Sequence, residues 1–136
     1  MPLMTWQDSM SVGVKLLDDD HKKLIGMVNE LHDGILEGRR KEALGHVLDE
    51  LVKYTKIHFM HEEDMFSKTK YPAGAAHKKE HDDLVQKAAD LQARFKTGPT
   101  SMLSLEVMGF LKSWLNHHIG GSDKAYTKHL NASGIH

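Results

Sequence analysis

Apolar residues recur every three to four positions along most of the chain, the spacing that places them on one face of an α-helix. Glycine and proline interrupt this pattern between the apolar stripes. The pattern predicts an N-terminal arm over residues 1–17 and helices over residues 18–37, 41–67, 73–96 and 101–130. Because these helices are long and joined by short links, we expect an all-α fold, an up-down-up-down antiparallel four-helix bundle.

The ends of the predicted helices carry local signals. The acidic run Asp18, Asp19 and Asp20 is expected to cap the first helix and to place negative charge at its positive end. Pro72 is suited to start the third helix, and Gly98-Pro99 is expected to stop it.

The 136 residues are enough for one compact core and too few for two, so we expect a single domain over residues 1–136. A formal net charge of -1 provides no electrostatic footprint for nucleic acid or for an anionic membrane surface. No run of apolar residues is long enough to span a bilayer, and the start, MPLMTWQDSM, does not resemble a signal peptide. These features predict no membrane insertion and a cytoplasmic location.

Histidine is unusually frequent in this chain, which has eleven histidines and no cysteine. Any bound metal must therefore be held by nitrogen and oxygen. Some of these histidines, together with one glutamate, continue the apolar stripes of the predicted helices and so face the core. They are His21 on the first helix, His58 and Glu62 on the second, His77 and His81 on the third, and His118 on the fourth.

These positions lie near the start of the first and third helices and near the end of the second and fourth. In an antiparallel bundle those four ends meet, so the histidines and the glutamate are expected to converge. Each buried polar group without a partner costs about 1 to 3 kcal/mol, which a bound metal would offset. Five imidazoles with carboxylates exceed the four positions of a tetrahedral zinc site, so two metal ions are implied.

The full set of motifs resembles the hemerythrin family, and most closely the single-domain bacteriohemerythrins. The motifs are His21, the runs His58-Phe59-Met60-His61-Glu62 and His77-Lys78-Lys79-Glu80-His81, the run Trp114-Leu115-Asn116-His117-His118-Ile119, and Asp123. The resemblance implies a non-haem centre of two iron ions (Fe2+/Fe3+) with an oxo or hydroxo bridge. One iron would be bound by His77, His81 and His118, and the other by His21 and His58 with one position left free. Glu62 and Asp123 would bridge both ions.

Asp123 does not fit a regular helix. Five residues separate it from His118, a rotation of about 140° in an α-helix, which would place the two side chains on different faces. Gly120 and Gly121 lie between them, and we expect them to permit a bulge or a loosened turn that brings Asp123 to the metals.

The resemblance also suggests an apolar oxygen pocket, which would exclude water and protons. Its expected lining is Leu24, Phe59, Trp114, Leu115 and Ile119. Ordinary core packing would bury the same side chains.

The remaining histidines fall outside the stripes and are expected to be exposed to solvent: His32, His46, His61, His117, His129 and His136.

The family resemblance implies that the chain is not an enzyme but binds dioxygen reversibly, for storage, transport or delivery. Two carboxylates and a hydroxide reduce the charge of two ferrous ions to about plus one, and neutral imidazoles add no negative charge, which favours binding over oxygen activation. The alternatives are a di-iron peroxidase, a reductase consuming oxygen or nitric oxide, and an iron-buffering protein. Nitric oxide is a further candidate ligand, and the sequence identifies no acceptor protein.

Overall fold

The structure, a computed structural model of the chain, describes residues 3–98 and 101–136, without the side chains of Ser101 and Ser122. Its main helices are α1 (Lys15–Leu36), α2 (Arg40–Thr69), α3 (Gly74–Thr97) and α4 (Ser101–His117). A short helical turn, η1 (Asp8–Met10), precedes them. After α4 come the π-helical turn η2 (His118–Asp123), the turn η3 (Lys124–Tyr126) and the short helix α5 (Thr127–Ala132).

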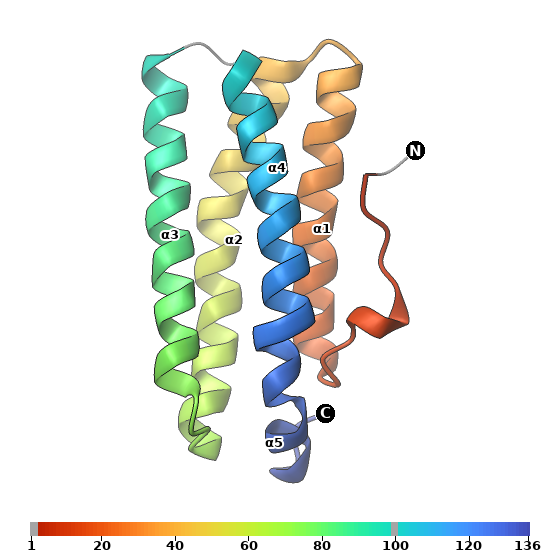
Figure 1. Cartoon of the computed structure of the whole chain (residues 1–136), viewed down its shortest axis with the longest axis vertical. Coiled ribbons are helices and arrows are strands. Elements are labelled where there is room, and N and C mark those ends of the chain that lie inside the picture. The colour runs from red at the N-terminus through yellow and green to blue at the C-terminus, as the bar shows by residue number, and fades with distance from the viewer. Residues whose placement is uncertain (1–2, 99–100) are drawn as a thin grey trace.

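The four long helices form the expected all-α antiparallel bundle, in which α1 and α3 each pack against both α2 and α4 (Figure 1). The start of α1, the end of α2, the start of α3 and the end of α4 lie together at the lower end of the bundle in this view. Helical periodicity and short connections were therefore sufficient to predict the architecture. In the described part of the chain, no helix combines the length and apolarity needed to cross a membrane.

Two apolar clusters stabilise the bundle on either side of its polar layer. The larger cluster runs along the bundle from Leu24 and Leu115 toward Leu44 and Leu103. The smaller cluster closes the lower end and consists of Val12, Val14, Leu17, Phe66, Tyr126 and Leu130. Because α1 passes from Leu17 to Leu24 through His21, the polar layer lies between the two clusters, where water has little access.

The N-terminal arm runs beside α1 (Figure 1), and hydrogen bonds along its length attach it to the bundle. The backbone of Met4 donates to the side chain of Asn29 at 2.8 Å, and the Asn29 amide donates back to the Met4 carbonyl at 2.7 Å. Further along the arm, the carbonyl of Val12 accepts a hydrogen bond from Thr127 at 2.7 Å. The arm therefore covers the seam between α1 and the C-terminal part of the bundle.

The acidic run does not cap α1, which corrects the sequence prediction. The helix begins at Lys15, with Val14 at the N-cap and no side-chain cap hydrogen bond. Burial of Val12 and Val14 against the bundle brings the arm close enough for the helix to start earlier, so the three carboxylates lie inside its first turns. They take different partners: Asp18 binds Ser11 and the Val12 amide, Asp19 pairs with Lys15, and Asp20 faces α2.

Other helix ends differ from the prediction by a few residues. The second helix continues to Thr69 and ends at Lys70, which adopts the left-handed conformation with φ of 56°. Helix α3 begins at Gly74, so Pro72 lies just before it, and Gly98 is its C-cap. Pro99, the other expected stop signal, lies outside the described residues. The fourth helix was expected to continue to residue 130, but α4 ends at His117 and the π turn follows.

Candidate metal centre

Five histidines and two carboxylates from α1, α2, α3 and the π turn that follows α4 meet in the layer between the apolar clusters. None of them is more than 4% exposed. They are His21, His58, Glu62, His77, His81, His118 and Asp123, all seven of the residues that the sequence and its family resemblance selected. Their convergence follows from the antiparallel helix order, since each helix presents one inward face at the same end.

The Asp123 carboxylate is surrounded by imidazole nitrogens. Its Oδ1 lies 2.8 Å from Nε2 of His77 and 2.8 Å from Nε2 of His118. Its Oδ2 lies 2.8 Å from Nε2 of His21. Asp123 thus joins histidines from α1, from α3 and from the π turn itself.

The Glu62 carboxylate has a similar position on the other side of the layer. Its Oε1 lies 3.0 Å from Nε2 of His58 and 3.2 Å from Nε2 of His81. Its Oε2 lies 3.6 Å from Nε2 of His77. Both carboxylates therefore face the same interior space as the Nε2 atoms.

The π-helical turn is what brings Asp123 into the site. In a π-helix the backbone hydrogen bond joins residues five apart, which places Asp123 on the same face as His118. The expected local distortion is confirmed. The two glycines inside the turn do not use their special backbone freedom, because neither has positive φ and a Cβ at Gly120 or Gly121 would meet nothing within 4 Å.

The seven residues form two overlapping groups, each able to hold a metal ion. One group is Glu62, His77, His81, His118 and Asp123, and the other is His21, His58, Glu62 and Asp123. Within each group the potential ligand atoms lie within 4.8 Å of one another. The two groups share both carboxylates, the arrangement expected of ligands that bridge two ions.

Unsatisfied polar atoms support the fit of a metal. In the described structure, both oxygens of Glu62 and of Asp123 are buried without a hydrogen bond of acceptable geometry. The same is true of Nε2 in His77, His81 and His118, although carboxylate oxygens lie nearby. Leaving so many buried atoms unpaired would be costly, and nitrogen and oxygen donors of this kind suit iron. The residues present therefore fit bound metal.

In the metal-free protein, protons take over part of the charge balance. Burial lowers the pKa of His58, but the charge of Glu62 and the hydrogen bond with Asp20 outweigh it and raise the pKa to about 10. Burial is likewise outweighed at His77, where Asp123 and Glu62 raise the pKa to about 9. Burial and the charge of Glu62 act to raise the pKa of Asp123, but the adjacent imidazoles of His118, His21 and His77 outweigh them and lower it. The site therefore attracts positive charge.

Comparison with known proteins agrees with this geometry. Residues 12–130 match the family model of the hemerythrin HHE cation binding domain. This chain belongs to the hemerythrin family. A bacteriohemerythrin of Methylococcus capsulatus is 41% identical over 97% of this chain and 100% of its own length. A bacteriohemerythrin of Stenotrophomonas maltophilia is 37% identical over 97% of this chain and 84% of its own length.

Comparison with solved structures also identifies the hemerythrin fold. A wild-type hemerythrin crystal structure superimposes with a TM-score of 0.82 at 39% identity, covering 94% of this chain and 98% of the other. The family-type site of this chain is thus a histidine and carboxylate cluster that can bind metal, and iron follows from the family.

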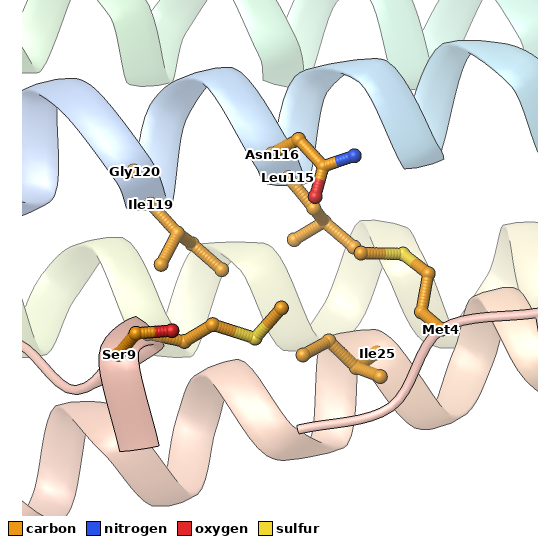
Figure 2. Close-up of a pocket in the computed structure, with 8 residues that line it drawn as sticks. Met4, Ser9, Ile25, Leu115, Asn116, Ile119 and Gly120 are labelled. Carbon is orange, nitrogen blue, oxygen red and sulfur yellow. The ribbon is translucent and has the colours of Figure 1, made fainter. Parts of the chain in front are cut away.

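The side chains expected to line an oxygen pocket in this hemerythrin domain fall into two sets. Leu115 and Ile119 line a cavity of about 210 Å³ between α4, α1 and the arm, across from Ile25 and Met4 (Figure 2). Leu24 is buried in the same apolar cluster as these two residues.

The other two expected pocket residues stack on histidines of the cluster. The ring of Phe59 lies parallel to His81 with centroids 3.7 Å apart. Trp114 lies against His118 with centroids 4.3 Å apart. These two side chains restrict rotation of the imidazole rings, and the role of all five residues in an oxygen pocket stays a prediction.

Three of the histidines expected to be exposed in this hemerythrin domain are partly buried, namely His32, His61 and His129. The exposed fraction of the His61 side chain is 32%, because its Nδ1 lies 2.9 Å from Asp20. His129 reaches the carbonyl of Thr69 at 2.8 Å. The expectation was wrong because single-helix periodicity does not account for partners on neighbouring elements.

Sequence reasoning also missed two carboxylates that contact the hemerythrin ligand set, Asp20 and Glu63. Asp20 contacts His58, and Glu63 lies 3.2 Å from Nδ1 of His81. Tyr126, in the smaller apolar cluster, is fully buried with its ring 5.6 Å from that of His77. A signal for the first of these contacts was available, since Tyr54, His58 and His61 share one face of a helix at spacings of four and three.

Proposed function

We propose that this chain holds two iron ions and binds dioxygen reversibly, for storage, transport or delivery rather than for catalysis. The five histidines with Glu62 and Asp123 are the proposed ligands, and an oxo or hydroxo group is the proposed third bridge. Because the two metal groups occupy one compact layer of the bundle, we also propose that residues 1–136 act as one hemerythrin-like domain.

The observation that carries the proposal is the unequal size of the two ligand groups. Five residues surround one position and four surround the other, and both carboxylates belong to each group. If each group held a six-coordinate ion and the two ions shared a bridging group, the three-histidine group would be complete. The group with His21 and His58 then has one position free for an external ligand.

When bound, two ferrous ions supply the electrons that reversible dioxygen binding requires. The chain itself orients the ligands and excludes water. Phe59 and Trp114 stack on His81 and His118 and restrict ring rotation. Leu115 and Ile119, which flank His118 in the sequence, are buried apolar side chains that would disfavour entry of protons and water at the site.

Anaerobic reconstitution with ferrous iron tests the proposal. We expect about two irons per chain and a visible charge-transfer band that appears with oxygen and disappears when oxygen is removed. Nitric oxide, the second candidate ligand, is expected to compete for the same position. Immediate decay of the band would favour an enzyme, and variable or single-ion loading would favour iron buffering.

A further inference from the structure

Asp20 is a buried carboxylate beside the proposed metal centre, and it does not face the metals. Its side chain points from α1 to α2, where three donors meet it. Tyr54 donates to Oδ1 at 2.7 Å, and the Nδ1 atoms of His58 and His61 lie 2.9 Å and 2.9 Å from Oδ2. Asp20 is only 3% exposed, so these contacts replace water almost completely.

The hydrogen bonds determine which nitrogen of His58 carries the proton. An ionised carboxylate can only accept, so Nδ1 of His58 must be the donor. The hydroxyl of Tyr54 and the imidazoles of His58 and His61 all lie at donor distance from this one carboxylate, which is the arrangement around an ionised acceptor. In the neutral ring, Nε2 then keeps its lone pair, and it points at the interior beside Glu62 at 3.0 Å.

Among the site histidines, His58 has an unusually well-buried outer partner. Nδ1 of His81 also has a carboxylate partner, Glu63, but at 3.2 Å and with 31% of the Glu63 side chain exposed. Nδ1 of His21 has no hydrogen-bond partner within the described chain. His58 is therefore the more firmly held histidine of the smaller metal group.

We propose that Asp20 is a positioning residue, whose carboxylate orients the ring of His58 so that its Nε2 faces the metal centre. Tyr54 and His61 hold that carboxylate in turn, and His61 connects it to the protein surface. This role rests on the proposed function, which makes His58 a ligand of the ion with the free position. The proposal predicts a selective effect. Loss of the Asp20 carboxylate weakens metal binding by the smaller group and leaves metal binding by the three-histidine group unchanged.

The experiment is a calorimetric and optical titration of the metal-free protein with Co2+. We compare the unchanged chain with Asp20→Asn and with the matched control Asp19→Asn, whose partner is the surface residue Lys15. The unchanged chain and the control are expected to bind two Co2+ per chain. Asp20→Asn is expected to bind one Co2+ normally and the second about 10- to 100-fold more weakly.

A spectroscopic signature separates positioning from general stabilisation. In the Co2+ protein, the ring N–H proton of His58 is expected to give a shifted, slowly exchanging NMR signal that Asp20→Asn broadens or moves. A lower melting temperature with unchanged affinity for both ions and an unchanged signal would overturn the proposal. If Asp20→Asn does not fold, Tyr54→Phe replaces it in the titration. Weaker binding of the second Co2+ by Tyr54→Phe supports the positioning role, and unchanged binding of that ion overturns it.

The two proposals fail in different ways. If the unchanged chain binds fewer than two Co2+ ions, the two-ion centre is wrong and the role of Asp20 falls with it. If the unchanged chain binds two ions and Asp20→Asn binds both equally well, the centre stands and the Asp20 proposal alone is overturned.

Discussion

The side chains of this site contribute to the proposed metal centre in different ways. The two shared carboxylates, Glu62 and Asp123, face every Nε2 atom of the cluster, whereas Phe59 and Trp114 restrain imidazole rings by stacking. Leu115 lines the cavity between α4, α1 and the arm. Substitutions at these positions are therefore expected to have distinct effects on metal content and on the bound ligand.

The double substitution His77→Ala with His81→Ala removes two of the three histidines in the larger metal group. We expect iron content to fall from about two ions per chain to one or fewer, because the remaining donors leave that position incompletely coordinated. Metal analysis after anaerobic reconstitution measures this. Two exposed histidines, His46 and His117, changed together to alanine provide the control. Two irons per chain in the first variant would refute the ligand assignment.

Leu115→Gln tests the apolar side of the site. Leu115 is 2% exposed and lines the cavity of about 210 Å³, so the amide would bring a polar group and water toward the metals. We expect faster autoxidation at unchanged iron content, with a stability loss of about 1 to 3 kcal/mol. The matched control is Leu105→Gln on the exposed face of α4. Equal autoxidation rates in the two variants would exclude a protective role for Leu115.

Among the helical elements, the π turn is the main departure from regular structure. It converts a five-residue separation between His118 and Asp123 into a shared face. Since Gly120 and Gly121 have open space around them and ordinary φ values, local glycine freedom is not what requires the turn. We attribute it instead to the contacts of Asp123 with three buried histidines.

Gly120→Ala combined with Gly121→Ala tests this explanation. We expect the variant to keep about two irons per chain and to change in stability by no more than about 1 to 2 kcal/mol, because alanine fits both positions and favours helical backbone. Asp123→Ala, in contrast, is expected to lose iron. Loss of iron in the double alanine variant would show that the glycines themselves are needed for the turn.

For the molecule as a whole, the polar layer sets how stability depends on pH. In the metal-free protein the pKa of His58 is raised to about 10 and that of His77 to about 9. A raised pKa in the folded state stabilises the protein below the unfolded value of about 6.5, and this stabilisation is lost as the pH rises through the folded value. The free energy of unfolding of the metal-free protein should therefore decline as the pH rises from about 6.5 to about 10.

Calorimetry of the metal-free protein from pH 6.5 to 10 measures that decline. We expect the melting temperature to fall across this range, with a loss of stability on the order of a few kcal/mol, since one pKa unit corresponds to about 1.4 kcal/mol. The metal-loaded protein should melt higher and change less, because bound metal keeps the imidazoles unprotonated. A metal-free protein with constant melting temperature over this range would contradict the proton-based charge balance.

Several features of this protein followed from local sequence alone. The repeat of Leu24, Val28 and Leu31 marks one buried helix face, and His21 continues that face whatever its neighbours are. Helix order and short links then require the histidine-bearing ends to meet. Local periodicity encodes which face of a helix is buried, so the bundle and the convergence of the histidines could be predicted.

Tertiary structure decided how the acidic residues are used. Asp20 looked like a helix cap, but burial of the arm starts α1 earlier and turns this carboxylate toward Tyr54 and His61 on α2. Asp123 reaches the site only through a π turn, whose geometry periodicity does not specify. The physical reason is that a helix stripe depends on residues three or four positions apart, whereas the partner of a buried charge depends on elements that meet only after folding.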